Sequence, residues 1–353
     1  MVGVPRESRA FFGPRRSRKG RCVSVSVLGL WSDCRTTRRG ARRAPHGRIR
    51  LSWAVAGAPV LPPRTILAAV DFSDTSLTAL VFAARFAQHC DAALHVLHVQ
   101  DPLLGIAAQH EGFDLARDTD DALKRFIESA SPAADCAPQR HTVTGVARES
   151  ILSTAYRLDA QLVVVGSRGM SRVEHLVFGS TTEGVLRGAG VSVVVVPTGW
   201  TPPSIDARDL SGVGPVVAGV DLSDRSAAAA KAGCALASML GTSLVLVSVV
   251  PKLSVLSGWD AFAERVVRDR VATVRQALQE IVDGLGCTIP VEMRVEVGQV
   301  AAALAAAAAP DPDRAPVLVL GRASGGIGNA PGAIAYRVLS GPNVPVLMHI
   351  ALP

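Results

Sequence analysis

Residues 65–74 read TILAAVDFSD, an unbroken apolar run that ends in Asp71 and continues into small polar residues. Apolar runs without alternation are typical of parallel strands that helices cover on both faces. Ser73 or Asp74 can cap the helix that follows, because apolar residues recur at helical spacing over residues 75–88. The stretch therefore predicts the first strand and the first helix of a parallel α/β sheet.

The same pattern returns 150 residues later, where VDLSD at 220–224 repeats VDFSD at 70–74. In both copies, short apolar runs alternate with segments of helical period. In the first copy, a connection with Pro102 and Gly105 follows the second run. The predicted strands are 65–71, 93–99, 141–144, 161–165 and 192–196, then 216–221, 243–249, 291–295, 316–320 and 344–349. Such alternation implies right-handed crossovers between parallel strands. The predicted fold is α/β: two tandem doubly wound domains, each a five-stranded parallel sheet flanked by helices, in a Rossmann-like architecture.

The chain has 353 residues, 48% of them hydrophobic, which suffices for two packed cores. We predict domains at 63–199 and 213–353, joined by a linker at 200–212. Residues 1–50 hold 14 basic and two acidic residues, whereas the remainder is mildly acidic, so the net charge of +7 predicts no specific nucleic-acid partner. Residues 1–62 are interpreted as a disordered or spurious extension. A targeting peptide and a basic arm for anionic partners stay open as alternatives.

The six cysteines form no Cys-x-x-Cys pair and no zinc-binding spacing. Cys90, Cys136 and Cys234 lie in or beside apolar segments, which favours buried free thiols and a reducing cytoplasm. No run of 18 apolar residues occurs, so no membrane-spanning helix is predicted.

The loop after the fourth predicted strand of the first copy reads GSRGMSRVEHLVFGST, residues 166–181. Ligands of open parallel sheets bind beyond the carboxyl ends of the strands, where the strand order reverses. The glycine spacing, Gly-x2-Gly-x9-Gly-Ser, lets backbone amides approach a polyphosphate, and a helix that begins near Ser180 aims its N–H groups at the anion. The hydroxyls of Ser180 and Thr181 can add hydrogen bonds, and Arg168 or Arg172 can supply positive charge. The alternatives are a tight strand-to-helix connection and, for Asp71, a helix cap.

At these residues the chain resembles the universal stress protein family, in its tandem form and its ATP-binding branch, over about residues 64–198 and more weakly over 213–352. The resemblance implies that Asp71 and its neighbours line the adenine and ribose side, and that Val99 contacts the base. It further implies that the loop glycines and Ser180 hold the ribose and the phosphates. The implied ligand is ATP, alone or with Mg²⁺. The implied binding residues are Ala69, Val70, Asp71, Val99, Gly166, Ser167, Arg168, Gly169, Gly179, Ser180 and Thr181.

The second copy departs from that spacing. Its loop begins with Gly321-Arg322, but Gly332 comes two to three residues early and is followed by Ala333 instead of a hydroxyl residue. We therefore expect ATP to bind mainly in the first copy, with about one nucleotide per chain.

Three common motifs of nucleotide-dependent and hydrolytic enzymes are missing from the sequence. The sequence has no Gly-Lys-Ser/Thr of a P-loop and no Gly-x-Ser-x-Gly elbow, and no Gly-x-Gly-x-x-Gly follows the first strand. His95 and His98 are three residues apart in a strand and face opposite ways, which argues against a shared metal. The predicted function is a nucleotide-dependent regulator or sensor in the stress response, not an enzyme. A slow ATPase or phosphotransfer enzyme, and a partner-binding scaffold with a structural nucleotide, remain alternatives. The expected partners are an adenine nucleotide and either a second copy or the other domain of the same chain.

Overall fold

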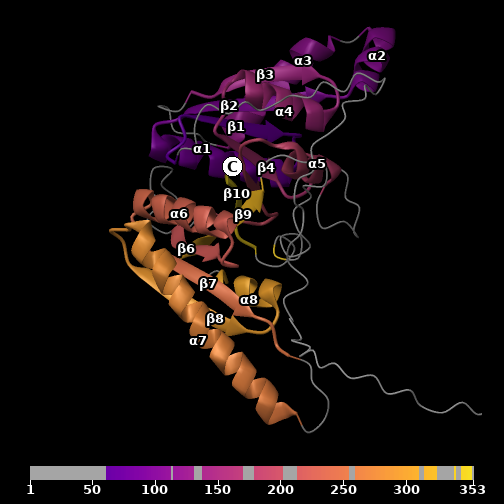
Figure 1. Cartoon of the computed structure of the whole chain (residues 1–353). Coiled ribbons are helices and arrows are strands. Elements are labelled where there is room, and N and C mark those ends of the chain that lie inside the picture. Colours follow the sequence, from indigo (N-terminus) through magenta and orange to yellow (C-terminus); the bar gives the residue numbers. More distant parts are fainter. Residues whose placement is uncertain are drawn as a thin grey trace, which may run out of the picture. The chain divides into compact units, whose positions relative to one another are not determined.

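A computed structural model of the protein describes residues 61–112, 114–130, 137–169, 179–201, 213–253, 259–309, 314–323, 338 and 343–351 (Figure 1). All of these residues belong to one compact unit. Residues 1–60 of the extension predicted at 1–62, Cys136 and most of the linker lie outside them, so the domain boundaries stay predictions. Below, the first half means the described residues of 61–201, and the second half means those of 213–351.

Each half supplies five strands. The first half contains β1 (Thr65–Val70), α1 (Asp74–Cys90), β2 (Ala93–Gln100), α2 (Pro102–Glu111), α3 (Leu115–Ser129), β3 (Gln139–Thr144), α4 (Ala147–Arg157), β4 (Leu162–Gly166), α5 (Ser180–Gly188) and β5 (Ser192–Val196). The second half contains β6 (Val213–Gly219), α6 (Asp224–Met239), β7 (Leu244–Val250), α7 (Asp260–Leu285), β8 (Val291–Val297), α8 (Val300–Ala307), β9 (Ala315–Ala323) and β10 (Val346–Ala351). The predicted strands are thus all present, and α2 is a helix that the sequence pattern does not predict.

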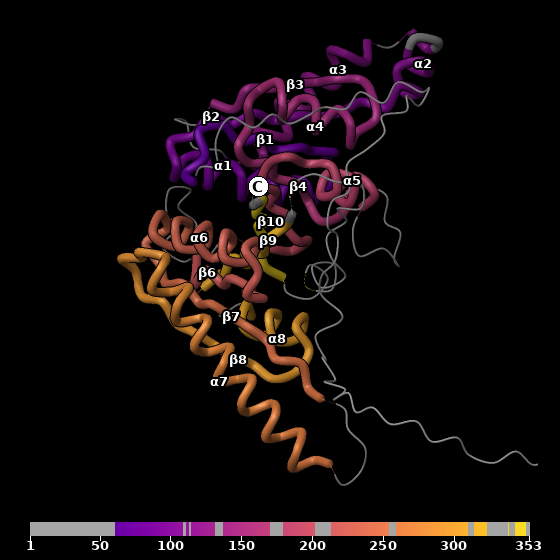
Figure 2. Tube along the Cα trace, in the orientation of Figure 1, coloured from indigo at the N-terminus to yellow at the C-terminus, as the bar shows by residue number. Residues whose placement is uncertain are grey.

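The ten strands form one sheet in the order β3-β2-β1-β4-β5-β10-β9-β6-β7-β8. Within each half every pairing is parallel, whereas β5 and β10 pair antiparallel, with Val194 opposite Leu347. Figure 2 shows β10 and β9 between β4 of the first half and β6 of the second. This arrangement confirms the two doubly wound domains and their pairing within one chain. The strand order reverses between β1 and β4, and again between β6 and β9.

Two hydrophobic layers hold the helices on the sheet. One layer joins residues of α1, α3, α6 and α7 to one face, and includes Ile66, Ala68 and Leu246. The other joins residues of α4, α5 and α8 to the opposite face, and includes Leu67 and Val163. Each layer contains residues of both halves, so burial of apolar surface stabilises the pairing of the halves as well as each half.

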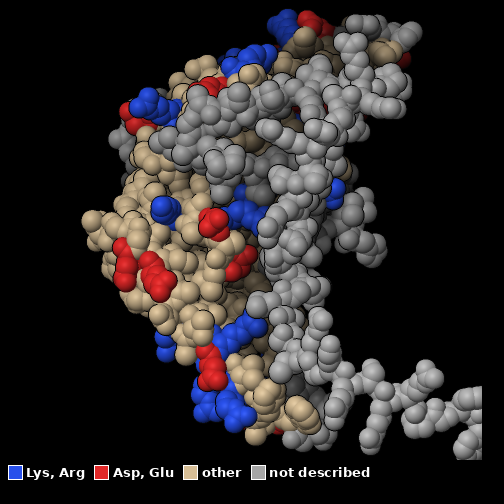
Figure 3. All heavy atoms as spheres, viewed as in Figure 1, with Lys and Arg blue, Asp and Glu red and all other residues tan. Residues whose placement is uncertain are grey.

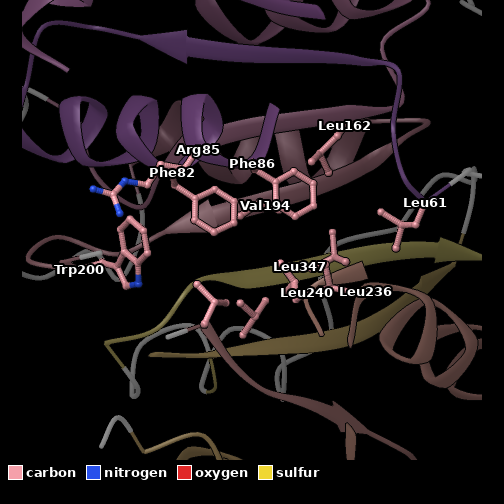
Figure 4. Close-up of a pocket in the computed structure, with 12 residues that line it drawn as sticks. Leu61, Phe82, Arg85, Phe86, Leu162, Val194, Trp200, Leu236, Leu240 and Leu347 are labelled. Carbon is pink, nitrogen blue, oxygen red and sulfur yellow. The ribbon is translucent and has the colours of Figure 1, made fainter. Parts of the chain in front are cut away.

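The first layer contains an apolar pocket at the seam between β5 and β10 (Figure 4). Phe82 and Phe86 of α1 face Leu236 and Leu240 of α6 across it, and Trp200 lies at one side. The indole of Trp200 is 5% exposed and packs edge-on against Phe82, with ring centroids 5.4 Å apart. Its Nε1 has no hydrogen-bond partner among the residues that the structure describes. Apolar side chains of both halves therefore meet at the seam on this face, and His89 Nε2 lies 2.8 Å from Met239 O at the ends of α1 and α6.

The cysteines differ from the prediction at one position. Cys234 is joined to Cys287 in a disulfide, whereas a buried free thiol was expected. Cys234 lies on the buried face of α6, and Cys287 follows the left-handed Gly286 that ends α7, which brings the two Cα atoms to 6.1 Å. Cys90 is free, as predicted, and burial raises the pKa of its thiol to about 12.

Charges of both signs lie side by side on the face drawn in Figure 3, and the described residues of that face form no single basic stripe. In the described part of the chain, no helix combines the length and the hydrophobicity that crossing a membrane requires.

Candidate functional site

The candidate site lies where β1 and β4 end, at the first reversal of strand order. Asp71 follows β1, and Gly169 belongs to the loop that follows β4. A Cβ atom built on Gly169 would lie 2.4 Å from Oδ2 of Asp71, so this backbone and the carboxylate are in close contact. A Cβ atom on Gly179 would lie 3.4 Å from the amide nitrogen of Gly169. The structure therefore brings the Asp71 carboxylate close to two loop glycines that lie far from it in the sequence.

The turn after β1 fixes the orientation of Asp71. Its Oδ1 accepts hydrogen bonds from Ser73 Oγ at 2.6 Å and from Ser73 N at 3.2 Å. Ser73 is the residue that caps α1, since its Oγ accepts from Ser76 N at 3.2 Å. Phe72 between them has φ of +63°, a left-handed conformation that makes the turn tight enough for these bonds. Asp71 is thus held by the cap but is not itself the cap.

The N-terminus of α5 forms the opposite wall. Gly179 is its N-cap residue, with φ −63° and ψ 147°, and within the described part of the chain no side chain caps the helix. Helices leave their first N–H groups without intrahelical partners, and an anion can take those bonds. Ser180 is exposed and Thr181 is half-buried, and Thr182 Oγ1 ties the first turn to β4 by donating to Gly166 O at 2.7 Å. The first turn of α5 can therefore accept an anionic group.

Gly166 has a packing role of its own. A Cβ atom there would lie 2.9 Å from Thr75 Cγ2 and 3.1 Å from Thr75 O, because the first turn of α1 passes directly over the end of β4. Ser167 is buried, and its N–H donates to Val196 O at 2.8 Å. Arg168 is exposed. Arg172 lies outside the described residues.

The apolar members of the predicted set lie on two faces of the sheet. Ala69 and Val99 are half-buried against the layer of α4 and α5, on one face. The side chain of Val70 is buried in the opposite layer, and its carbonyl oxygen lies 3.0 Å from His98 Nδ1. Burial lowers the pKa of His98, so the ring is neutral and donates to that carbonyl. Ala69 and Val99 therefore share a face on which a flat apolar group can rest, whereas the Val70 side chain does not.

The two histidines of β2 point apart, as predicted. His95 Nδ1 lies 2.9 Å from His141 Nε2, while the His98 ring stacks near Phe72 with centroids 4.3 Å apart. Burial, followed by the charge of His141, lowers the pKa of His95. The described residues contain no group of three or more His, Cys, Asp or Glu side chains placed to hold a metal ion.

The second half repeats the turn but not the strand end. Asp221 Oδ1 accepts from Ser223 N at 3.0 Å, and Leu222 has φ of +64°. Partial burial raises the pKa of Asp221, but hydrogen bonds from Ser223 and Ser226 and the charge of Arg225 outweigh it, so the net pKa is lowered. Gly332 and Ala333 lie outside the described residues, so the expected loss of the phosphate loop stays a prediction.

One buried charged residue was missed by sequence reasoning. Arg322 occupies the position after Gly321 that Ser167 occupies after Gly166, and it is 6% exposed. The sequence shows only an arginine at the start of a glycine-rich loop. In the structure it lies within β9, which is longer than predicted, and its Nη2 donates to Ala189 O of the first half.

Comparisons with known proteins agree with this architecture. The Universal stress protein family matches residues 63–197. A universal stress protein of Mycolicibacterium smegmatis is 32% identical over 191 residues, which are 52% of this chain and 63% of that protein. The chain thus spans less than two thirds of that relative's length.

A shorter relative is matched almost completely. The universal stress protein YxiE of Bacillus subtilis is 32% identical over 143 residues, which are 37% of this chain and 97% of that protein. The crystal structure of a universal stress protein from Archaeoglobus fulgidus superposes with a TM-score of 0.53 at 18% identity, covering 81% of this chain and 98% of that one, and supports the fold alone. On these matches, the chain belongs to the universal stress protein family.

Proposed function

We propose that the first half binds ATP where β1 and β4 end, and that its occupancy makes the protein a nucleotide-dependent regulator or sensor in the stress response. The observation that carries the proposal is the contact of the Asp71 carboxylate with the Gly169 backbone, beside the uncapped N-terminus of α5. A carboxylate and a set of free amides are the two groups that a ribose and a polyphosphate require.

Each part of the nucleotide has a matching surface. The phosphates face the first turn of α5, where Ser180 and Thr181 add hydroxyl donors and the positive end of the helix dipole favours negative charge. The ribose hydroxyls donate to Asp71, whose orientation Ser73 already fixes. The base rests on the face that Ala69 and Val99 share. Gly166 and Ser167 serve this arrangement through the loop backbone, and Arg168 supplies charge from the surface.

Binding without turnover is the activity we propose, in the cytoplasm where ATP is available. Asp71 Oδ1 accepts two hydrogen bonds from Ser73, and this engaged carboxylate is badly placed to activate a water for hydrolysis. Release of inorganic phosphate from bound ATP, measured in the binding samples, decides between this activity and a slow ATPase.

The test uses Gly179, where an added Cβ makes only ordinary contact with the protein. Gly179→Val places two further methyl groups where the phosphates must approach, so we expect the ATP dissociation constant to rise by about tenfold or more. Gly284→Val in α7 is the matched control, because a Cβ there meets nothing within 4 Å.

Isothermal calorimetry on the full chain measures the affinity, and mass spectrometry of the protein as purified identifies any nucleotide already bound. A folded Gly179→Val protein that binds ATP like the parent would place the site elsewhere. Equal losses in both variants would indicate a general effect on the fold.

A further inference from the structure

Arg322 is a buried cation that the proposed site does not use. It lies on β9 in the second half, opposite Ile350 of β10, and is 6% exposed. Its Nη2 donates to the carbonyl oxygen of Ala189, in the first half. Its Nε and Nη1 have no hydrogen-bond partner among the described residues. Burial lowers its pKa only to about 10, so the guanidinium is charged at neutral pH.

The burial of this charged side chain lowers the stability of the fold. A buried charge with unused donors lowers the stability of the folded state, unless a specific interaction offsets the loss of hydration. The corresponding residue of the first half, Ser167, is small and places no charge across the seam. Only the second half thus has a buried arginine at this position. The one described acceptor of its guanidinium therefore indicates what the residue does.

That acceptor belongs to the residue that ends α5. The N-terminus of the same helix is where we propose that the phosphates bind. Ala189 is the C-cap residue of α5, and Gly179 is its N-cap residue. Helix dipoles place partial positive charge at the N-terminus and partial negative charge at the C-terminus. A cation bonded to the C-cap residue lies beside the negative end of the dipole, and an anion at the first amides lies at the positive end, so both stabilise the same nine-residue helix.

We propose that Arg322 is a positioning residue for the nucleotide site of the other half: it clamps the C-terminus of α5 across the seam, so that nucleotide binding and pairing of the halves reinforce each other. This inference rests on the proposed function. By linkage, whatever Arg322 adds to nucleotide affinity, the nucleotide adds to the Arg322 contact. The second half thus takes part in binding without holding the ligand.

The test compares Arg322→Met, which keeps the length and loses the charge, with Arg322→Lys, which keeps the charge. Arg294→Met on β8 is the matched control, because Arg294 lies in the same half and pairs with Glu292 at the surface. We expect Arg322→Met to raise the dissociation constant for ATP by about five- to tenfold. Arg322→Lys should recover part of the affinity, and Arg294→Met should leave it unchanged.

Hydrogen exchange of the nucleotide-free protein provides a second readout, which does not depend on ATP. Amides of residues 180–189 should exchange faster in Arg322→Met than in the parent, while those of α4 keep their rates. If Arg322→Met does not fold, Arg322→Gln, which is also neutral, takes its place in both measurements.

The outcomes separate the two proposals. A folded neutral variant with the parent's ATP affinity and the parent's exchange in α5 overturns the inference and leaves the proposed function standing. A parent protein that binds no ATP overturns the proposed function. In that case the hydrogen exchange of α5 alone tests whether Arg322 holds the helix. An unchanged exchange rate in the neutral variant refutes that role. Loss of affinity in Arg322→Lys equal to that in Arg322→Met would also count against the role of the charge.

Discussion

The strand ends of the two halves agree at one strand and differ at another. After β1 and β6 the chain makes the same turn, with Phe72 and Leu222 at φ of +63° and +64° and each aspartate bonded to the serine two residues on. After β4 and β9 the halves part, since Ser167 is a small residue and Arg322 is a buried cation that crosses the seam. An Asp-x-Ser turn therefore belongs to the fold of this unit. Asymmetry between the halves arises at the fourth strand of each.

The first prediction tests the equivalent glycine of each half, Gly166 at the end of β4 and Gly321 in β9. A Cβ atom on Gly321 would lie 2.5 Å from Arg225 O, and one on Gly166 would lie 2.9 Å from Thr75 Cγ2. We expect Gly321→Val to lower the free energy of unfolding by about 3 kcal/mol or more, because the obstructing atom is backbone. Gly166→Val should cost less, because part of its obstruction is a side-chain methyl group. Urea denaturation measures both, and a stable Gly321→Val protein would refute the packing role.

The second prediction concerns the seam that joins the halves. Burial lowers the pKa of His349 from 6.5 to about 4, and its Nδ1 lies 3.2 Å from Ser192 Oγ across the β5–β10 pair. Because the unfolded chain binds this proton more tightly, the contribution of His349 to stability is complete above pH 6.5 and is lost as the pH falls toward 4. Its share of the loss is about 3 kcal/mol.

His349→Gln keeps a polar partner for Ser192 and does not titrate. The difference in unfolding free energy between this variant and the parent, followed from pH 7 to pH 4, isolates His349 from the other buried histidines. Parallel pH profiles for the two proteins would mean that folding does not change the pKa of His349, and would refute the prediction.

The third prediction sharpens the comparison at the repeated turn. Asp71→Asn and Asp221→Asn retain the oxygen that accepts from the serine, so neither should greatly alter the turn. We expect Asp71→Asn to weaken ATP binding by about tenfold, because a neutral amide accepts weaker hydrogen bonds than a carboxylate. Asp221→Asn should leave the affinity unchanged. Calorimetric titration of the full chain gives affinity and stoichiometry together, and equal effects at both positions would show that both halves bind nucleotide.

Local pattern predicts most of this fold. The apolar run at 65–70 and the cap at Ser73 predict β1 and the start of α1, because both depend on neighbouring residues alone. Helix α2 escapes such reasoning, since Pro102 and Gly105 mark a connection in sequence while the structure continues as a helix from Pro102 to Glu111. Pro at the first position of a helix is compatible with it, and this position does not distinguish helix from turn.

Long-range features could not be predicted in the same way. The pairing of Cys234 with Cys287 depends on where α7 ends relative to α6, over a separation of 53 residues. The burial of Arg322 depends on the two halves sharing a sheet. For the candidate site, glycine spacing predicts a ligand-binding loop after β4, and the structure separates two roles among its glycines. Gly166 is required by the passing helix, whereas the backbone and contacts of Gly179 would admit a side chain.

The antiparallel pairing of β5 with β10 decides which strand edges face other molecules. Those two strands cover each other, so the sheet ends at β3 and β8. Exposed strand edges invite association with other chains, and charged side chains discourage it. Glu292, Arg294 and Glu296 lie along β8, and Arg140 lies on β3. A second copy could pair with the edge of β5 or β10 only after the two halves had separated. That separation would also break the contact between Arg322 and α5. The charged side chains on the described outer strands β3 and β8 therefore oppose edge-to-edge pairing at those two strands.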